Sequence, residues 1–564
     1  MSSYIEAAEK WLAQDFDTQT QTELQALIDS ADEAALDEAF HTTLNFGTAG
    51  LRGVLGPGPN RMNQLMVARV SYALGQVLHS SKMNSGIVVG FDGRHNSEVF
   101  ARLTEAILTA QGHKVYSFQT YAPTPLVAYA VTALKASAGV VVTASHNPPE
   151  YNGYKVYWSN GAQIISPIDK EIKEVIDKTT DIGAINRQLN EELLVDIEDF
   201  RAKYIDDVVA LSVSNEEKDL SIIYTPLHGV GAGILTEVFK RAGFKHLHTV
   251  PAQTEPDPDF STVKFPNPEE EGALDLAIEL AKEKNAELII ANDPDADRLA
   301  SVIRDDAGSF ISLDGNQIGM LLAYYLLSKE ADLSKCLVIN TVVSTMMLAD
   351  VAKAMGAQSA TTLTGFKWIA NKALELEKEQ GTRFVIGFEE ALGSTSYNLV
   401  RDKDGISAAL LFACLASEQK QAGSSVYEYL LGMYRRFGLY QTRQRSITLK
   451  GHSGLQQISD IMGRIRSFSD QTIGSEQISV RADLEKGEFK NADQYRGMPA
   501  ANVIIFHLGD SKRVIARPSG TEPKLKIYYE VKTECDDYQK AHAEAEANID
   551  ALDRLFCETF AIDH

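Results

Sequence analysis

The hydrophobic and polar positions of this chain predict a series of strand and helix units. Short apolar runs rich in β-branched residues predict buried strands, and apolar positions three or four residues apart predict amphipathic helices. In the first part of the chain, strands are predicted at 86–91 and 115–118 and from Val140 into Ser145, and helices at 99–110 and 126–134. Alternation of this kind predicts a mainly parallel sheet with helices on both of its faces.

The same alternation continues in the middle of the chain and changes near its end. Further strands are predicted at 222–224, 288–291, 337–339 and 384–386, with helices through Phe239 and from about Met346 to Met355. After about residue 440 the pattern becomes short strands near Ile447, Ile478 and 503–506, followed by a helix at 538–556. Residues 1–40 predict amphipathic helices that pack as an extension.

The strand that begins at Val140 ends abruptly in the polar loop Ser145-His146-Asn147-Pro148-Pro149. Because two prolines prevent this loop from continuing as a helix, Ser145 is expected at the carboxyl end of a strand, where parallel sheets collect catalytic groups. A serine in an ordinary turn is the alternative. Lys155 follows ten residues later. It could act as a general acid or base in a closed site, or it could be a solvated lysine.

Three carboxylates at alternate positions follow the strand predicted at 288–291. Asp293, Asp295 and Asp297 are separated by Pro294 and Ala296, and Arg298 comes next. In an extended loop, which the proline favours, a period of two points the three side chains to one side. Converging anionic oxygens predict a site for Mg²⁺ or a similar hard cation. A solvated acidic turn is the alternative, which the preceding apolar strand and the following arginine weaken.

Two further loops carry groups suited to a phosphorylated, hydroxylated ligand. Glu389 and Glu390 lie between glycines after a predicted strand, where they could accept hydrogen bonds from the hydroxyls of a sugar or could be solvated. The stretch from Arg517 to Lys524 offers a guanidinium, two hydroxyls, a glycine and a lysine, a set that suits a phosphate monoester, with a polar surface turn as the alternative. Lys403, in the segment 401–405, marks another place where cations can meet phosphate.

Two glycine-rich segments lead to different conclusions. Arg52 lies among three glycines in 46–53, which suits a backbone that approaches an anion closely, although a surface arginine in a turn is the alternative. The segment 229–233 resembles a dinucleotide-binding loop, but Ile234 stands where that fingerprint needs its third glycine. The second segment is therefore not predicted to bind a dinucleotide.

Composition limits the classes of protein that this chain could represent. Its 564 residues predict three or four domains, and 54 basic against 77 acidic residues, a net charge of −23, argue against a nucleic-acid-binding surface. We expect a cytoplasmic protein without membrane contact, because the sequence contains neither a long apolar run nor a signal peptide at its start. The four cysteines are far apart, which favours reduced thiols.

In chain order, the serine loop, the acid triplet, the glutamate loop and the C-terminal loop provide the parts of phosphoryl transfer on a polyol phosphate. This set resembles the α-D-phosphohexomutase family, which includes phosphoglucomutases and phosphomannomutases, over nearly the whole chain. The resemblance implies an α/β fold with three related α/β sandwich domains, mixed sheets and a smaller C-terminal α+β domain around a central cleft. We expect the helical extension at 1–40 and the domains at 41–206, 207–311, 312–440 and 441–564.

The resemblance also implies a role for each candidate residue, with Ser145 as the phosphoserine and Lys155 as the acid or base. The implied catalytic groups are Arg52, Ser145, His146, Lys155 and Arg298. The implied Mg²⁺ ligands are Ser145, Asp293, Asp295 and Asp297. The implied substrate-binding residues are Thr364, Gly365, Glu389, Glu390, Lys403, Arg517, Ser519, Gly520, Thr521 and Lys524.

The implied reaction interconverts glucose 1-phosphate and glucose 6-phosphate through a phosphoserine and a bisphosphorylated sugar, with Mg²⁺ as cofactor and glucose 1,6-bisphosphate as activator. Ala391 stands where glucose-type members commonly have serine, and Pro294 and Ala296 stand where many members have glycines. These departures resemble the type-2 phosphoglucomutase and phosphopentomutase branch, so pentose and mannose phosphates are alternative substrates.

Other classes of function are also considered. A metal-dependent sugar phosphatase would use similar parts, and a non-catalytic sugar-phosphate sensor would bind without turnover. A serine hydrolase is disfavoured because Ser145 lacks the flanking glycines of that nucleophile loop. We expect small sugar phosphates as partners, no nucleic acid, no membrane, and a monomer or weak homodimer.

Overall fold

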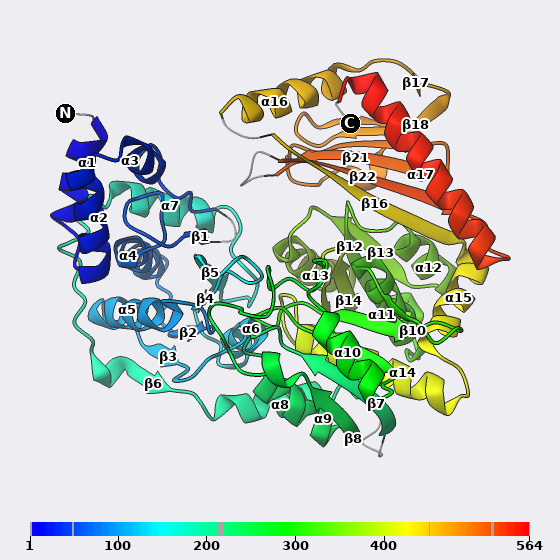
Figure 1. Cartoon of the computed structure of the whole chain (residues 1–564), viewed down its shortest axis with the longest axis horizontal. Helices are drawn as coiled ribbons and strands as arrows, with labels where there is room; N and C mark the ends of the chain where they lie inside the picture. The colour runs from blue at the N-terminus through cyan, green and yellow to red at the C-terminus, as the bar shows by residue number, and fades with distance from the viewer. Residues whose placement is uncertain (1–2, 48–49, 213–217, 450–451, 520–523, 563–564) are drawn as a thin grey trace. The chain divides into compact units, whose positions relative to one another are not determined.

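The computed structural model describes residues 3–47, 50–212, 218–449, 452–519 and 524–562. The chain divides into two compact units, the first containing 1–314 and 391–421 and the second containing 315–390 and 422–564. Figure 1 labels the helices and many of the strands of both units. Within the described ranges, no helix combines the length and the apolar character that crossing a membrane requires.

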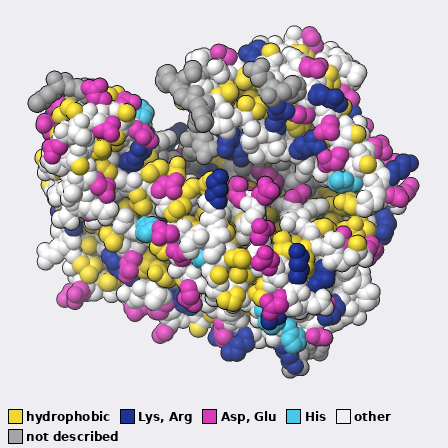
Figure 2. All heavy atoms as spheres, in the orientation of Figure 1, with side chains coloured by type: hydrophobic (Ala, Val, Ile, Leu, Met, Phe, Trp, Pro, Cys, Tyr) yellow, Lys and Arg dark blue, Asp and Glu magenta, His cyan; other side chains and the backbone are white. Residues whose placement is uncertain are grey.

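The predicted N-terminal extension consists of three helices, α1 (Ser3–Leu12), α2 (Thr18–Ser30) and α3 (Glu33–Phe40). The Asp17 carboxylate caps α2 by accepting a hydrogen bond from the backbone N–H of Gln19 at 3.0 Å. Trp11, Leu24 and Leu36 are buried in the core of the first domain. Acidic side chains cover much of the outer surface of these helices in Figure 2, and elsewhere on that face lysines and arginines are interspersed with aspartates and glutamates.

The first domain contains a six-stranded mixed sheet with the order β1-β5-β4-β2-β3-β6. Strand β2 pairs in parallel with β3 and β4, whereas β5 pairs antiparallel with β4 and β1. Every residue of β2 and β4 is buried, which explains their continuous apolar sequences. The sequence pattern missed β5 because its buried residues include the polar Asn152 and Lys155. The elements are β1 (Leu51–Val54), α4 (Gln64–Ser80), β2 (Ile87–Phe91), α5 (Ser97–Ala110), β3 (Val115–Ser117), α6 (Thr124–Ala133), β4 (Ala138–Val142), β5 (Tyr151–Trp158), α7 (Ile168–Lys178), η1 (Glu191–Leu193), β6 (Leu194–Asp196) and α8 (Phe200–Val209).

The second domain contains a five-stranded sheet with the order β11-β10-β9-β7-β8. Strand β7 pairs in parallel with β8 and β9, and β10 pairs antiparallel with β9 and β11. Helix α14, from the segment 391–421, packs against β7 and β9 of this sheet. The elements of this domain are β7 (Lys218–Thr225), α9 (Ala232–Arg241), β8 (Phe244–Thr249), η2 (Pro251–Gln253), α10 (Asp275–Glu283), β9 (Leu288–Ala291), β10 (Ala300–Arg304) and β11 (Phe310–Ser312). The segment 391–421 of the same unit contains β15 (Gly393–Ser396) and α14 (Gly405–Gln421).

The second unit begins with an α/β part in which β12 lies between the parallel neighbours β13 and β14. Its helices carry apolar side chains, such as Phe366 and Ile369 of α13, that pack against Leu337 and Ile339 of β12. The elements are α11 (Gly315–Ser328), η3 (Leu333–Lys335), β12 (Cys336–Thr341), α12 (Met347–Met355), β13 (Gln358–Thr362), α13 (Phe366–Gln380), β14 (Arg383–Glu389) and α15 (Val426–Phe437).

The same unit ends in an antiparallel sheet with the order β16-β22-β21-β20-β18-β17, and β19 pairs with β18. Alternate residues of β20 face opposite sides, since Phe506 joins the core that includes α16 and α17, whereas Ile505 packs with Val342 and Leu363. The elements are β16 (Leu439–Thr448), α16 (His452–Ser467), β17 (Thr472–Ile473), β18 (Glu476–Asp483), β19 (Glu488–Lys490), η4 (Asp493–Tyr495), β20 (Ile504–Leu508), β21 (Lys512–Pro518), β22 (Lys524–Thr533) and α17 (Tyr538–Phe560).

The predicted α/β class with mixed sheets and a final α+β part is confirmed. The predicted domain boundaries and the central cleft stay predictions.

Candidate active site

Ser145 follows β4 and faces the acidic loop of the second domain. Its hydroxyl donates a hydrogen bond to Asp293 Oδ2 at 2.6 Å, and its Oγ lies 3.2 Å from His146 Nδ1. The backbone φ of Ser145 is 53°, a left-handed conformation that is uncommon for residues other than glycine. Its backbone N–H donates to the Thr143 hydroxyl at 2.8 Å, and the residue is only 3% exposed. The loop therefore holds the serine hydroxyl at the acid triplet and out of bulk solvent.

A buried arginine that the sequence analysis missed fastens this serine loop. Arg94 donates hydrogen bonds to the backbone carbonyls of Ser145 at 2.6 Å, Pro148 at 2.8 Å and Tyr151 at 3.2 Å, and to that of Asn147. Its guanidinium also lies 4.8 Å from the centre of the Phe260 ring. Arg94 comes just after β2, whose carboxyl end lies beside that of β4. The position of Arg94 just after a predicted strand was the feature of the sequence that could have identified it.

We expect Arg94→Lys to lower kcat/KM of the phosphoryl transfer that the resemblance implies about 100-fold, or about 2.7 kcal/mol, because one ammonium cannot replace a guanidinium fork on several carbonyls. Steady-state kinetics on purified protein measures this change. Arg102→Lys is the matched control, since Arg102 also bonds backbone carbonyls of this domain, those of Phe118 and Gln119. Equal activity of Arg94→Lys and Arg102→Lys would contradict the role assigned to Arg94.

The acid loop after β9 is a turn, so the predicted extended conformation is wrong. The backbone N–H of Ala296 donates to the Asp293 carbonyl at 2.8 Å, and Ala296 has a φ of 56°. The turn still brings the three carboxylates together, because one oxygen each of Asp293, Asp295 and Asp297 lies within 4.8 Å of the others. All three side chains are buried.

The glycine-rich segment 229–233 packs against this turn. The Val230 N–H donates to the Pro294 carbonyl at 2.9 Å. A Cβ atom on Gly229 would lie 2.4 Å from the Pro294 Cα, so only glycine allows this approach of the two backbones. The glycines that resemble a dinucleotide-binding loop thus support the acid turn.

Two lysines approach the acid triplet from different segments of the first unit. Lys155 Nζ, from β5, lies 2.7 Å from Asp295 Oδ2 and 3.0 Å from Asp297 Oδ2. Lys403 Nζ, from the loop before α14, lies 3.2 Å from the same Asp297 oxygen. Burial alone would lower the pKa of Lys155, but the two carboxylates outweigh it and raise this pKa above its usual value. Lys155 is therefore an ammonium in this arrangement.

The acid triplet fits a hard divalent cation. One oxygen each of Asp295 and Asp297 is buried without a hydrogen-bond partner among the described residues. Burial, followed by the negative charges of the other two aspartates, raises the pKa of Asp293 well above its usual range. Carboxylate oxygens that converge without enough donors are the ligands that Mg²⁺ takes in proteins.

The remaining predicted catalytic groups also lie in the first unit. Arg298 donates its backbone N–H to Asp293 Oδ1 at 3.0 Å, and its guanidinium lies 3.3 Å from Glu269. Arg52, on β1, donates to the Asn147 side chain at 2.9 Å. Burial and then the nearby arginines lower the pKa of His146 well below its usual value, so its imidazole is neutral at pH 7.

The predicted sugar-recognition residues lie in the second unit. Glu389 accepts a hydrogen bond from the backbone N–H of Gly365 at 2.7 Å. Glu390 accepts hydrogen bonds from the hydroxyls of Ser344 at 3.0 Å and Thr341 at 3.2 Å. The Thr364 hydroxyl oxygen is buried without a hydrogen-bond partner among the residues described. The loops around 364 and 389 therefore meet, and the role of their residues in sugar recognition stays a prediction.

The predicted phosphate-binding loop joins β21 to β22 in the second unit. Arg517 pairs with Lys526 across the two strands, and the Ser519 N–H donates to the Lys524 carbonyl at 2.7 Å. These contacts place the described ends of the loop side by side. The predicted ligands Gly520 and Thr521 lie outside the described residues.

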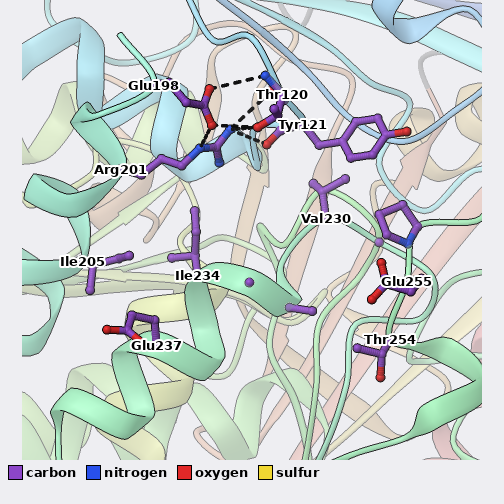
Figure 3. A pocket seen from close by; sticks show the side chains of 14 residues that line it. Thr120, Tyr121, Glu198, Arg201, Ile205, Val230, Ile234, Glu237, Thr254 and Glu255 are labelled. Carbon is purple, nitrogen blue, oxygen red and sulfur yellow. Dashed lines mark hydrogen bonds and ion pairs between the residues drawn. The ribbon is translucent and has the colours of Figure 1, made fainter.

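A separate cavity of about 610 Å³ in the first unit is lined by Thr120, Tyr121 and residues of α8 and α9 (Figure 3). Of its charged side chains, Glu198, Arg201 and Glu237 already have partners. Glu198 accepts hydrogen bonds from Arg201 at 2.5 Å and from the Thr120 hydroxyl at 2.7 Å, and Glu237 pairs with Arg241. Ile234 rises from the first turn of α9 toward Arg201 (Figure 3). We assign no ligand to this cavity.

Four segments of the chain match the domain families of phosphoglucomutase and phosphomannomutase. The α/β/α domains I, II and III match residues 43–182, 202–308 and 314–434, and the C-terminal domain matches residues 480–550. The matches occur in the order of the family and cover most of the sequence.

Curated relatives match over nearly the full length of both chains. A probable phosphoribomutase of Schizosaccharomyces pombe is 38% identical, and the match covers 93% of each chain. A probable phosphomannomutase of Haemophilus influenzae is 40% identical over 84% of this chain and 93% of its own. A phosphoglucomutase of Staphylococcus haemolyticus is 36% identical over 89% of this chain and 92% of its own. The names of these three relatives give three different sugars.

Proposed function

Because this chain belongs to the phosphoglucomutase/phosphomannomutase family and is thus an isomerase of the phosphoglucomutase type, we propose that it moves a phosphoryl group between two hydroxyls of a sugar phosphate through Ser145. The observation that carries this proposal is the contact of 2.6 Å between the Ser145 hydroxyl and Asp293, within a triplet that also holds Lys155 and Lys403. A nucleophile beside a cation site and two ammonium groups suits phosphoryl transfer.

In the proposed cycle, phosphorylated Ser145 donates its phosphoryl group to the free hydroxyl of a sugar monophosphate. The bond from phosphorus to the serine Oγ breaks, a bond to the sugar oxygen forms, and the proton of the sugar hydroxyl ends on Ser145. The sugar bisphosphate then turns over and returns its other phosphoryl group to Ser145, with the proton moving the opposite way. The result is an isomerised monophosphate and a phosphorylated enzyme.

The residues of the first unit would stabilise the charge of the transferred group. Lys155 and Lys403 are held at the triplet, and Arg298 adjoins it. Asp293, Asp295, Asp297 and the serine oxygen would hold Mg²⁺, which when bound supplies positive charge beside the phosphoryl group. The raised pKa of Lys155 keeps it protonated at the start of each transfer. It can then protonate the departing oxygen, and the amine so formed takes the proton of the attacking hydroxyl in the same transfer, so that the proton passes through Lys155.

The residues of the second unit would recognise the rest of the substrate. Glu389 and Glu390 would accept hydrogen bonds from sugar hydroxyls, with Thr364 and Gly365 on the adjoining loop. Arg517, Ser519 and Lys524, with Gly520 and Thr521 between them in sequence, would bind the phosphate group that does not react. Since either phosphate of the bisphosphate must occupy this site, we expect recognition by charge more than by shape.

We propose glucose 1-phosphate and glucose 6-phosphate as the substrate pair, with glucose 1,6-bisphosphate as the activator. The phosphoglucomutase of S. haemolyticus supports this choice. The probable phosphoribomutase of S. pombe supports pentose phosphates as a second candidate, as does Ala391 after the two glutamates.

A coupled assay with Mg²⁺ and catalytic glucose 1,6-bisphosphate tests the choice of sugar by comparing kcat/KM for glucose 1-phosphate, ribose 1-phosphate and mannose 1-phosphate. We expect glucose to exceed the others by about tenfold or more, or about 1.4 kcal/mol of transition-state binding. A higher value for ribose would move the substrate to the pentose phosphates and leave the serine chemistry in place. Turnover of none of the three would contradict the proposed substrate class.

A further inference from the structure

The loop before α14 is tied to the first domain by a buried carboxylate that the proposed chemistry does not use. Asp402 is 1% exposed. One of its oxygens accepts hydrogen bonds from the Tyr157 phenol at 2.7 Å and the Gln163 amide at 2.7 Å. Its other oxygen accepts the backbone N–H of Lys403 at 2.8 Å. The carboxylate thus joins strand β5 and the segment after it to a loop more than 200 residues later in the chain.

The same carboxylate lies beside the Lys403 ammonium. Lys403 Nζ is 3.7 Å from the second oxygen of Asp402 and 3.2 Å from Asp297. The Lys403 side chain is only 14% exposed, so its position depends on these two carboxylates more than on water. A lysine side chain is flexible, so a fixed carboxylate such as Asp402 is needed to hold its ammonium at one position beside a transferred group.

Tyr157 and Lys155 belong to the same strand and are two residues apart, so their side chains lie on the same face of β5. Lys155 reaches Asp295 and Asp297, and Tyr157 reaches Asp402. Burial and then the Asp402 charge raise the pKa of Tyr157 well above its usual value, so its phenol stays protonated and donates. One strand therefore fixes Lys155 directly and Lys403 through Asp402.

We infer that Asp402, held by the Tyr157 phenol and the Gln163 amide, is a positioning residue that fixes the Lys403 ammonium beside Asp297 for phosphoryl transfer. This inference rests on the proposed function, because it assigns Lys403 to the transferred group and not to the sugar. Loosening Asp402 should therefore lower kcat and leave the KM of the sugar phosphate nearly unchanged.

A double-mutant cycle of Tyr157→Phe and Lys403→Met tests this inference. We expect Tyr157→Phe to lower kcat about tenfold with KM within about twofold, and Lys403→Met to lower kcat about 100-fold. Since Tyr157 acts through Lys403, the double variant should match Lys403→Met within about twofold. A double variant whose loss of kcat equals the product of the two single losses would overturn the inference. An unchanged kcat in Tyr157→Phe would also overturn it.

Tyr204→Phe is the matched control. The buried Tyr204 phenol donates at 2.8 Å to Asp404, two residues beyond Asp402 in the same loop. Both phenylalanine variants should lower the urea midpoint of unfolding, but only Tyr157→Phe should lower kcat. An equal loss of kcat in Tyr204→Phe would overturn the inference, because loosening of the whole loop would then explain both results.

Asp402→Asn provides a second route if Tyr157→Phe does not fold. It keeps an oxygen that can accept the hydrogen bond of the Tyr157 phenol but removes the charge beside Lys403, so we expect kcat to fall about tenfold. In the Lys403→Met background the same substitution should cause no further loss of kcat. Unchanged kcat in this variant would overturn the inference. Wild-type protein without mutase activity would instead defeat the proposed function, so the two failures are distinguishable.

Discussion

Replacing Ser145 by alanine lowers mutase turnover by about 10⁴-fold or more, because the substitution removes the oxygen that carries the phosphoryl group. The change should leave the fold intact. Only one hydroxyl is lost, the one that donates to Asp293. Alanine adopts the φ of 53° at about the same conformational energy as serine. The coupled assay measures turnover, and circular dichroism with thermal unfolding measures the fold.

Ser71→Ala is the control for this prediction. Ser71 is also a fully buried serine of the first domain, but its hydroxyl bonds Thr104 at 3.1 Å. Its loss should leave kcat within about threefold of wild type. Full activity of Ser145→Ala would contradict the phosphoserine mechanism. If that variant loses its fold and Ser71→Ala keeps it, Ser145→Gly provides the kinetic test, because glycine adopts this φ without strain and also lacks the hydroxyl.

Asp295→Asn should lower kcat about 10³-fold and raise the Mg²⁺ concentration for half-maximal activity about 100-fold or more. Asp295 has a buried oxygen without a hydrogen-bond partner among the described residues, and an amide is a far weaker ligand than a carboxylate for a hard cation. The substitution also removes one of the two carboxylates that hold Lys155. Titration of activity with Mg²⁺ measures both effects.

A binding measurement separates the metal effect from the lysine effect. Wild-type protein should unfold at a higher temperature as Mg²⁺ is added, since a ligand of the folded state stabilises it, and Asp295→Asn should lose most of this shift. Asp306→Asn, in the exposed turn between β10 and β11, is the control and should keep it. An unchanged Mg²⁺ requirement in Asp295→Asn would contradict the assignment of the acid triplet as the metal site.

The sequence predicted the residues of the acid triplet but not its conformation. The serine loop and the triplet each follow an apolar strand, and such local signals need no knowledge of distant contacts. The predicted extended loop was wrong because Pro294 occupies the second position of a turn closed by the hydrogen bond from Ala296 to Asp293. Proline at that position favours a turn, so the signal was present but was interpreted as an extended segment.

The supporting residues could not be predicted in the same way. Arg94 follows a predicted strand, but its bonds to backbone carbonyls are not indicated by any side-chain pattern, and the Tyr157 phenol reaches a carboxylate of a distant segment. Both contacts exist only after the strands have assembled. By contrast, the glycines of 229–233 were visible in the sequence, but the close approach of Gly229 to the backbone of Pro294 was not.

Detection of a phosphoserine is the most direct test of phosphoryl transfer through Ser145. The protein is incubated with glucose 1,6-bisphosphate and Mg²⁺, and its peptides are analysed by mass spectrometry before and after addition of a sugar monophosphate. We expect one phosphoryl group on the peptide that contains Ser145, and we expect the sugar to take it up as a bisphosphate without release of inorganic phosphate. Absence of a phosphoryl group on Ser145 in active enzyme, or sustained release of inorganic phosphate as from a phosphatase, would contradict this expectation.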